Sequence, residues 1–457
     1  MDEIVVRSPF DGSEVGRVPR AGPADVDAAV AAAHTALDRD PLPPWRRAEV
    51  LDAASRLLSE RAEDLARTIA REAAKPLKAA RVEAARAVST FTFAAVEARR
   101  LTGEMVPVDA AAVGEGRIAF TLRVPVGVVG AISPFNFPLN LVAHKVAPAI
   151  AAGCPVVLKP ASQTPLTAMA LAELLADSGL PPGHLTVVAG SGSEVGNALV
   201  EHPDVPYITF TGSSDVGWGI RDRAPRKKVA LELGNSSPLV IAADGDWDRA
   251  ARAVAAGGFT HAGQSCVSVQ RVLVHDDVAG PFCQALAKLV DDLVVGDPLD
   301  GTTDVSALIT PGERDRVVSW IEEAVSGGAE VLTGGDVRDG VLAPTVLTDV
   351  TPEMRVSRDE VFGPVVAVQA CPSLHDALRL ADDTRYGLQA GIFTAGLETA
   401  LRAARQLHFG TVLINEVPTW RADQMPYGGV RESGNTKEGP AYAIREMTEA
   451  RLVVIQP

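Results

Sequence analysis

Short strands rich in valine and isoleucine alternate with amphipathic helices from Gly127 onward, and this alternation constrains the fold more than any other feature. Such strand–helix–strand units build parallel sheets. A second block of the same kind covers residues 239–414, and no long linker separates the two blocks. The sequence therefore predicts an α/β protein with two lobes packed together. The strands expected in the first block are 128–132, 156–158, 185–188, 207–210 and 229–231, with helices at 139–152 and 165–178.

The residues before this alternation are expected to be helical. Apolar residues recur with a period close to 3.6 over residues 46–72, which predicts one amphipathic helix there. Helices are also expected at 24–37 and 79–101. A segment punctuated by glycine and proline, residues 102–116, then leads into an expected strand at 118–124.

The composition fits a globular chain and excludes several classes of partner. Of the 457 residues, 47% are hydrophobic, which suits two or three domains with buried cores. A net charge of −15 opposes general affinity for nucleic acid or for anionic membranes, since both require a basic surface. The longest apolar run, residues 146–158, is shorter than the ~20 residues of a membrane helix. The first residues lack the basic start of a secretory signal, so neither a membrane nor a nucleic acid is expected as a partner.

The cysteines are scattered, and one of them lies in an unusual loop. Cys154, Cys283 and Cys371 have apolar or proline neighbours and are expected to be inert. Four cysteines without CxxC spacing form neither a disulfide framework nor a zinc site, so a reducing cytoplasm is the simplest setting. Cys266 follows Gly263-Gln264-Ser265, where small residues leave room for a carbonyl group to approach the sulfur. From the residues alone, a nucleophile and a bystander are equally open interpretations of this cysteine.

Two polar residues have the properties that a thiol nucleophile needs from its partners. Asn136 lies in a proline-stiffened loop after an apolar strand, where its amide is able to bind an oxyanion. Glu232 ends a strand with apolar flanks, and desolvation there raises the pKa of a carboxylate towards that of a general base. Taken singly, each has a structural alternative: a loop-capping asparagine and a salt-bridged glutamate.

Two glycine-containing turns are candidates for binding the phosphates of a nucleotide. Residues 190–196 miss the GxGxxG spacing by one residue, so an ordinary strand-to-helix turn explains them equally well. Residues 210–217 follow a strand and begin a helix. They offer hydroxyl groups and free amides to a pyrophosphate.

Together, these segments resemble the aldehyde dehydrogenase superfamily. The matching motifs occur in the same order in the chain, at residues 134–138, 158–165, 210–213, 231–234, 263–266, 360–364 and 426–429. The resemblance implies the fold of that family: two Rossmann-like α/β domains with parallel sheets, and a small β oligomerisation arm. It implies an NAD(P)-binding domain of residues 1–101 and 124–232 and a catalytic domain of residues 233–429. The arm and the C-terminal segment would be residues 102–123 and 430–457, and a homodimer or homotetramer would follow.

The resemblance also implies roles for particular residues. Cys266 matches the nucleophile, Asn136 the oxyanion-binding side chain and Glu232 the base that activates water for thioester hydrolysis. No metal is required by this chemistry. The residues that match the cofactor site are Lys159 and Ser162 at the adenosine ribose, Gly212 and Ser213 at the pyrophosphate, Glu360 and Phe362 at the nicotinamide ribose, and Ile132 and Pro134 before them.

Departures from the family pattern bear on the cofactor. Many members have glutamate at the position of Ser162, where it binds both ribose hydroxyls. A serine removes a negative charge that would repel a 2′-phosphate. The cofactor is therefore expected to be NADP or NAD, with acceptance of NADP favoured. Gly234-Asn235-Ser236 and residues 435–438 also depart from the common pattern, without loss of Glu232.

Clues to the substrate come from residues 417–427. This segment is similar to a branch that handles lactaldehyde, glyceraldehyde phosphate and phosphonoacetaldehyde, so a short polar or anionic aldehyde is expected. Trp420 and Arg421 are candidate substrate residues, and Arg421 would pair either with an anionic tail or with a carboxylate of the protein. His144 follows Asn136 by eight residues and would either face the substrate tunnel or pack between helices.

Two alternative functions remain. In a CoA-acylating aldehyde dehydrogenase, CoA takes the acyl group in place of water, and an available general base at Glu232 counts against it. A non-catalytic binding or structural relative would be expected to have lost the cysteine or the glutamate, and both are present.

Overall fold

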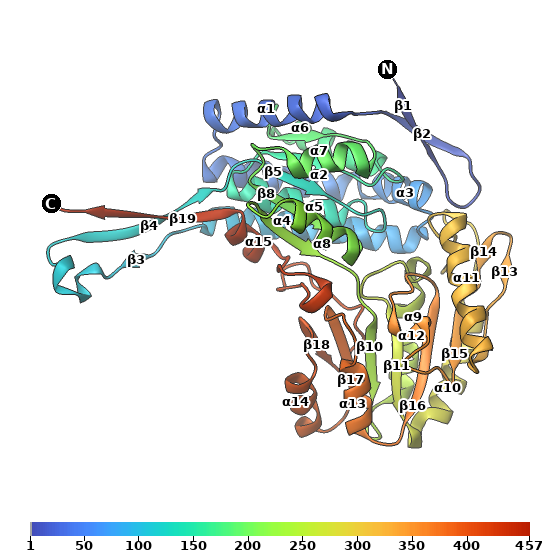
Figure 1. Ribbon diagram of the computed structural model, residues 1–457. Helices are drawn as coiled ribbons and strands as arrows, with labels where there is room; N and C mark the ends of the chain where they lie inside the picture. Colours follow the sequence, from blue (N-terminus) through green and yellow to red (C-terminus); the bar gives the residue numbers. More distant parts are fainter. Residues whose placement is uncertain (1) are drawn as a thin grey trace.

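Two sheets with parallel strands form the centre of the structure, a computed structural model that describes residues 2–457 (Figure 1). The sheet of the first lobe has five strands, all parallel, in the order β7-β6-β5-β8-β9. Their bounds are Leu185–Val187 for β7, Val156–Lys159 for β6, Val129–Ile132 for β5, Tyr207–Thr211 for β8 and Lys228–Glu232 for β9. The expected α/β class and the five expected strands are confirmed, with ends that differ by one residue.

Helices cover both faces of this sheet because its strands are apolar on both sides. One face packs on α2 (Pro44–Glu60), α3 (Ala62–Ala73), α4 (Leu77–Arg100), α5 (Asn140–Ala152) and α6 (Leu166–Asp177). The other face packs on α1 (Pro23–Arg39), α7 (Asn197–Glu201) and α8 (Ser214–Arg223). Every residue of α5 is buried, which explains its nearly uniform apolar sequence.

The second lobe contains a seven-stranded sheet in the order β12-β15-β16-β11-β10-β17-β18. Only the edge strand β12 is antiparallel to its neighbour. The strands are Glu330–Thr333 (β12), Thr345–Thr348 (β15), Val365–Cys371 (β16), Val269–His275 (β11), Ser237–Ile241 (β10), Gln389–Phe393 (β17) and Thr411–Ile414 (β18). The helices around them are α9 (Trp247–Phe259), α10 (Asp276–Asp291), α11 (Pro311–Ser326), α12 (Arg355–Arg358), α13 (Leu374–Asp382) and α14 (Leu397–Gln406), and a small hairpin joins β13 (Val337–Arg338) to β14 (Val341–Leu342).

The expectation for the N-terminal residues was wrong in two places. The chain begins with an antiparallel hairpin of β1 (Glu3–Arg7) and β2 (Glu14–Pro19), where only helices were expected. Each strand has a single buried residue, Val6 in β1 and Val18 in β2, so neither strand reads as an apolar run. The single helix expected at 46–72 is two helices, because Arg61 leaves the helical region with φ −99° and ψ 12°.

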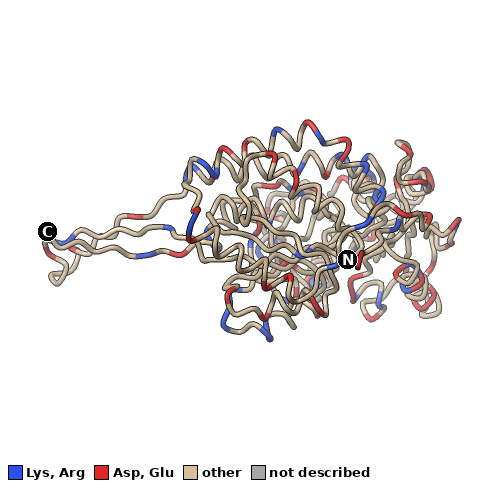
Figure 2. Tube along the Cα trace, turned by 90° about the horizontal axis from the view of Figure 1, so that it is seen from above, with Lys and Arg blue, Asp and Glu red and all other residues tan. Residues whose placement is uncertain are grey.

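A three-stranded antiparallel arm projects from the first lobe, as Figures 1 and 2 show. β4 (Ile118–Pro125) pairs along its whole length with the C-terminal strand β19 (Thr448–Ile455), and β3 (Met105–Val106) pairs on the other side. Short 3₁₀ turns, η1 (Val108–Ala110) and η2 (Ala112–Gly114), form its tip. Its exposed apolar side chains are Met105, Val113, Ile118, Leu122, Leu452, Val454 and Ile455.

The chain crosses between the lobes twice, and both crossings lie beside the same residue. β9 ends at Glu232, and β10 of the second lobe begins at Ser237. The chain returns through η5 (Arg431–Ser433), where Gly434 forms a β-bridge with Glu232, and α15 (Pro440–Glu446) then packs on α4 and α5. The remaining short turns are η3 (Gly192–Gly196) and η4 (Thr260–Gly263). Of the helices in residues 2–457, none has the length and apolar character that crossing a bilayer requires.

Candidate active site

Cys266 lies between the turn η4 and the strand β11, in the second lobe. His261 and Ala262 in this turn both have φ of 53°, a left-handed conformation that redirects the chain sharply before the cysteine. The Cys266 Sγ atom lies 3.0 Å from the Tyr427 hydroxyl. Burial raises the pKa of the Cys266 thiol to about 12, against the lowering effect of that hydrogen bond.

Asn136 faces the cysteine loop from the first lobe. Its Nδ2 atom donates to the Gln264 carbonyl oxygen at 2.8 Å, two residues before the cysteine. The Asn136 carbonyl oxygen accepts from Lys75 Nζ at 2.9 Å, and Lys75 is ion-paired with Glu83 at 2.6 Å. Glu83 also accepts from the backbone amides of Leu139 and Asn140. A fully buried ion pair therefore fixes the loop that carries Asn136.

Glu232 ends β9 between the two lobes. Both of its carboxylate oxygens are buried and lack a hydrogen-bond partner among the described residues. Burial raises the pKa of Glu232 well above its usual value, and the negative charge of Glu438 raises it further. Gly428, which follows Tyr427 in the chain, lies against this carboxylate. A Cβ on Gly428 would lie 2.4 Å from Glu232 Oε1, so a side chain at this position would crowd the carboxylate.

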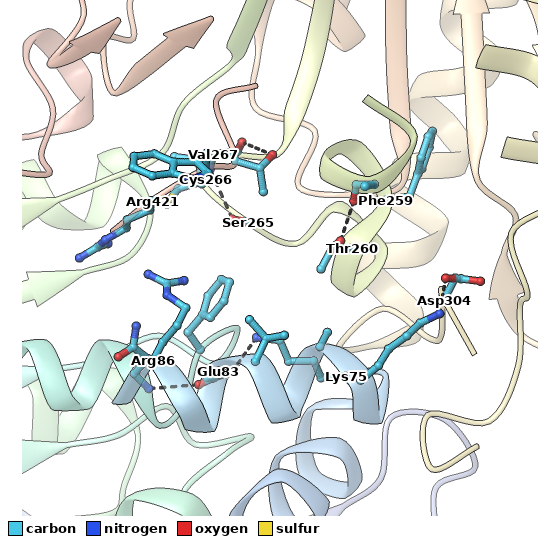
Figure 3. A pocket seen from close by; sticks show the side chains of 18 of the residues that line it. Lys75, Glu83, Arg86, Phe259, Thr260, Ser265, Cys266, Val267, Asp304 and Arg421 are labelled. Atoms are coloured by element: carbon cyan, nitrogen blue, oxygen red, sulfur yellow. Dashed lines mark hydrogen bonds and ion pairs between the residues drawn. The ribbon is translucent and has the colours of Figure 1, made fainter. Parts of the chain in front are cut away.

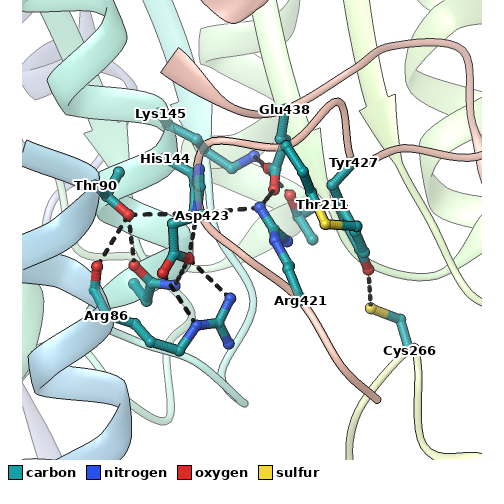
Figure 4. Close-up of polar contacts among 12 residues, drawn as sticks. Arg86, Thr90, His144, Lys145, Thr211, Cys266, Arg421, Asp423, Tyr427 and Glu438 are labelled. Carbon is teal, nitrogen blue, oxygen red and sulfur yellow. Dashed lines mark hydrogen bonds and ion pairs between the residues drawn. The ribbon is translucent and has the colours of Figure 1, made fainter. Parts of the chain in front are cut away.

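A buried charge network lies beside the Tyr427–Cys266 contact (Figure 4). Arg421 donates to Glu438 at 2.9 Å, and Lys145 lies 3.7 Å from the same carboxylate. Burial acts to raise the pKa of Glu438, but Arg421 and Lys145 outweigh it and lower the value to about 2. Glu438 is thus an anion next to Glu232, whereas Arg421, Lys145 and Lys437 favour the ionised form of Glu232.

A cavity of about 570 Å³ opens onto Cys266 (Figure 3). Its wall is mainly apolar, with four cationic side chains, and includes Phe137, Phe259, Thr419, Trp420, Tyr427, Lys75, Lys78, Arg86 and Arg421. Arg86 is ion-paired with Asp423 at 2.8 Å. Lys78 pairs with Asp304 and so joins α4 of the first lobe to a loop of the second. The cavity is large enough for a small organic molecule and leads to the sulfur.

The three expected substrate residues have different positions. Trp420 and Arg421 line the cavity. His144 does not: its side chain is buried in α5, and its Nε2 atom lies 3.1 Å from Asp423 and 3.0 Å from Arg421 (Figure 4). His144, the fifth residue of α5, packs behind the cavity wall because all sides of this helix are enclosed.

The expected cofactor residues of the first lobe lie at the carboxyl ends of its strands. Lys159 ends β6 and donates to the Pro160 carbonyl at 2.9 Å, and no carboxylate among residues 2–457 pairs with it. Burial lowers the pKa of Lys159 to about 8. Ser162 donates to the Gly190 carbonyl at 2.9 Å. Gly212 and Ser213 join β8 to the N-terminus of α8, and the Ser213 side chain does not cap that helix. A buried unpaired cation and a free helix N-terminus fit the phosphate and ribose groups of a dinucleotide.

The second lobe contributes the other two expected cofactor residues. Glu360 Oε1 accepts from the Asn235 amide at 3.0 Å, and a Cβ on Gly234 would lie 2.3 Å from Glu360 Oε2. Burial raises the pKa of Glu360 to about 7. Phe362 has φ of 47°, and its ring meets that of Phe135 edge-on at 5.8 Å. Phe135 follows Pro134, just after β5 ends at Ile132, so these groups meet where the lobes join.

Sequence reasoning missed several residues of this site. Tyr427 lies within the recognised motif at 426–429, but nothing in the motif indicates that its hydroxyl meets the sulfur. Lys75, Arg86 and Glu438 come from segments read only as helices or loops. Lys145 carried a usable signal, because a lysine within the apolar sequence of α5 must be buried and needs an anionic partner.

Comparisons with known proteins agree on one family. The model of the aldehyde dehydrogenase family matches residues 1–453. The 3-sulfolactaldehyde dehydrogenase of Priestia megaterium is 47% identical over 432 residues, covering 94% of this chain and 90% of the relative. The lactaldehyde dehydrogenase of Methanococcus vannielii is 39% identical over 418 residues, covering 91% and 88%. The crystal structure of glyceraldehyde-3-phosphate dehydrogenase from Methanocaldococcus jannaschii, complexed with NADP, has a TM-score of 0.96 at 35% identity and covers both chains completely.

Proposed function

The chain belongs to the aldehyde dehydrogenase family, and from this premise we propose that it oxidises a short anionic aldehyde to the carboxylic acid through a thioester on Cys266. It is an oxidoreductase that acts on aldehydes with NAD or NADP. One observation carries the proposal: a single cavity connects the Cys266 thiol with the guanidinium groups of Arg86 and Arg421.

The first half of the reaction is the formation of the thioester. Cys266 attacks the aldehyde carbon as a thiolate, which forms the carbon–sulfur bond and leaves an oxyanion. Asn136 Nδ2 and the backbone amide of Cys266 donate to that oxyanion. The second hydrogen of Nδ2 is available, since the first is held by the Gln264 carbonyl. As the oxyanion collapses to the thioester carbonyl, the carbon–hydrogen bond of the former aldehyde breaks, and a nicotinamide cofactor would accept the hydride.

The second half is hydrolysis, for which Glu232 removes a proton from water. Neither of its oxygens has a hydrogen-bond partner among residues 2–457, so both are free to accept a hydrogen bond from the attacking water. The hydroxyl oxygen then bonds to the acyl carbon, the carbon–sulfur bond breaks, and the thiolate of Cys266 is regenerated. The free carboxylate of Glu232 also favours water over CoA as the acyl acceptor.

The anionic part of the proposed substrate lies against Arg421 and Arg86. Arg421 lines the cavity, and a guanidinium group forms charge-assisted hydrogen bonds with a sulfonate, phosphate or carboxylate. The Glu438 and Asp423 partners already balance most of the arginine charge. The site would therefore select anionic aldehydes over neutral ones through directed hydrogen bonds more than through its net charge. The relatives that act on 3-sulfolactaldehyde and lactaldehyde support a hydroxylated three-carbon aldehyde.

We also propose an oligomeric state and a cellular compartment for this protein. The exposed apolar side chains of the arm and the free edges of its outer strands favour pairing with a second copy, so a homodimer or homotetramer is proposed. All four cysteines are free, which favours the reducing cytoplasm.

The proposal is tested by following reduction of NAD or NADP with a panel of aldehydes. The panel contains 3-sulfolactaldehyde, glyceraldehyde 3-phosphate, phosphonoacetaldehyde, lactaldehyde and long alkyl aldehydes. Anionic three-carbon aldehydes should give the highest kcat/KM, and Cys266→Ala should abolish turnover while Cys283→Ala retains it. Higher kcat/KM for long alkyl aldehydes would refute the proposed substrate class, and an acyl-CoA product formed only with CoA would refute hydrolysis. Cofactor binding without turnover of any aldehyde would favour a non-catalytic relative.

A further inference from the structure

The Tyr427 hydroxyl is the only side-chain hydrogen-bond partner of the Cys266 sulfur within residues 2–457 (Figure 4). The oxygen–sulfur distance is 3.0 Å, and Tyr427 is only 2% exposed. The backbone of Tyr427 is fixed on both sides: its amide donates to the Met425 carbonyl at 2.8 Å, and its carbonyl accepts from the Glu438 amide at 2.6 Å. The hydroxyl is therefore held at the sulfur by the fold.

The direction of this hydrogen bond follows from the chemistry of the thiolate. A thiol and a phenol are each able to donate, but a thiolate has no proton and only accepts. Once Cys266 is ionised, the phenol is necessarily the donor. Its proton stays on oxygen, and the proton lost by Cys266 passes to solvent.

Few other groups near Cys266 favour its negative charge. The charged residues that face it are Glu360 and Glu232, which oppose ionisation, and Arg421, which favours it. No lysine, arginine or histidine of the described chain forms an ion pair with the sulfur. The stability of the Cys266 thiolate therefore depends mainly on hydrogen bonding, whereas a thiolate beside an imidazolium is stabilised by its ion pair.

Arg421 acts on the phenol from the face of its ring. The guanidinium carbon lies 3.7 Å from the centroid of the Tyr427 ring, and the Glu438 carboxylate holds the guanidinium there. A cation over the ring face withdraws electron density from the phenol and makes its hydroxyl a stronger donor. Arg421, Tyr427 and Cys266 thus form one continuous contact chain.

We propose that Tyr427 is a catalytic hydrogen-bond donor, which stabilises the Cys266 thiolate and which Arg421 strengthens through the aromatic ring. The proposal rests on the proposed role of Cys266 as the nucleophile. When the sulfur attacks the aldehyde, its charge moves to the oxyanion at Asn136 and the bond from Tyr427 weakens. The phenol therefore increases the thiolate population and makes each thiolate somewhat less nucleophilic.

The test measures alkylation of Cys266 by iodoacetamide across the accessible pH range, in wild type and Tyr427→Phe. A hydrogen bond to a charged group accounts for about one pKa unit, so the thiol pKa should rise by about one unit in the variant. Because nucleophilicity rises with about half of the pKa change, alkylation at neutral pH should become about threefold slower. Tyr442→Phe removes an exposed phenol and should leave the profile unchanged, while Cys266→Ala identifies the signal.

A profile of Tyr427→Phe that coincides with that of wild type would overturn the proposal. Cofactor affinity and melting temperature report whether the variant is folded. Replacing Tyr427 with 3-fluorotyrosine keeps the ring and makes the hydroxyl a stronger hydrogen-bond donor. The pKa of the Cys266 thiol should therefore fall in this variant. An unchanged or raised thiol pKa contradicts the proposal, even if Tyr427→Phe does not fold. Alkylation needs no aldehyde. The proposed function would instead fail if Cys266→Ala still oxidised aldehydes, whatever the alkylation profiles show.

Discussion

At the scale of single residues, burial raises the proton affinity of Glu232, and Glu438 raises it further. Its anionic carboxylate raises the pKa of Glu232, which must be ionised to accept a proton from water. In Glu438→Gln that repulsion is lost, while Lys145 and Lys437 still favour the carboxylate. The rising limb on the acidic side of the pH profile for thioester hydrolysis should therefore move to lower pH.

Single-turnover hydrolysis rates across pH measure this shift. Glu432→Gln changes an exposed glutamate in the same returning segment and should leave the limb in place. A movement of the limb to higher pH in Glu438→Gln would contradict the assigned electrostatics.

Ser162 is expected to determine tolerance for a 2′-phosphate. A glutamate there would repel the phosphate dianion, so Ser162→Glu should lower kcat/KM with NADP at least about tenfold, a change of ~1.4 kcal/mol, and should spare NAD. Gln163→Glu adds the same charge one residue further along, at an exposed position, and should have a smaller effect. A wild-type enzyme that requires NAD strictly would refute this expectation.

Lys159 should make the affinity for NADP, relative to that for NAD, depend on pH. Its pKa of about 8 lies below the usual lysine value because of burial, so its positive charge is present at neutral pH and is lost as pH rises through 8. The Kd of NADP should therefore increase above that pH, more steeply than the Kd of NAD. Calorimetric titrations of both cofactors measure the difference, and parallel pH dependences would contradict it.

The sequence locates some of these residues and misses others for a physical reason. Cys266, Asn136 and Glu232 lie in local motifs whose residue types show their chemistry. The Tyr427–Cys266 contact joins positions 161 residues apart and depends on how two loops pack, which no local pattern contains. The same holds for His144, which helical spacing alone could not assign to the tunnel or to the interior.

At the scale of elements, the apolar pattern of the sequence predicted the strands that are buried on both faces of a sheet. The strands β5, β6 and β8 are buried throughout and read as continuous apolar runs. The break at Arg61 has neither glycine nor proline to mark it, so the helical pattern passed through it unchanged. The hairpin of β1 and β2 escaped because each of its strands has a single buried residue, so neither reads as an apolar run.

The Lys75–Glu83 pair links α4 to the loop that carries Asn136, and breaking it should be costly. Glu83→Gln leaves the buried ammonium of Lys75 without its counter-charge, so the free energy of unfolding should fall by about 3–5 kcal/mol. Asp52→Asn breaks the exposed pair with Arg99 between α2 and α4 and should change it by less than about 1 kcal/mol. Denaturant unfolding compares the two variants, and equal losses would contradict a structural role for the buried pair.

At the scale of the whole molecule, two blocks of alternating strands and helices imply two consecutive lobes, each with its own sheet. The family resemblance grouped residues 430–457 with the arm at residues 102–123, and β19 pairs with β4. No local pattern in the C-terminal residues indicates that Gly434 lies against Glu232. Glu232 is consequently enclosed by both crossings of the chain. Basic and acidic positions are interspersed along the outer helices in Figure 2.

The arm should determine the assembly. Leu452→Asp combined with Val454→Asp places charges on side chains that are 53% and 49% exposed in the single chain. If a second copy covers them, the double variant should dissociate by light scattering. Leu397→Asp, on an exposed leucine of α14, should not. An unchanged mass of the double variant would place the interface elsewhere.

In the proposed mechanism, Cys266 carries the acyl group and Glu232 activates the water that releases it. Glu232→Gln removes the base while the nucleophile remains, so the thioester should accumulate when this variant is mixed with cofactor and 3-sulfolactaldehyde. Mass spectrometry of the quenched protein should show the mass of the acid less water on the peptide that contains Cys266. An adduct on Cys154, Cys283 or Cys371, or turnover of Glu232→Gln at the wild-type rate without any adduct, would contradict the account.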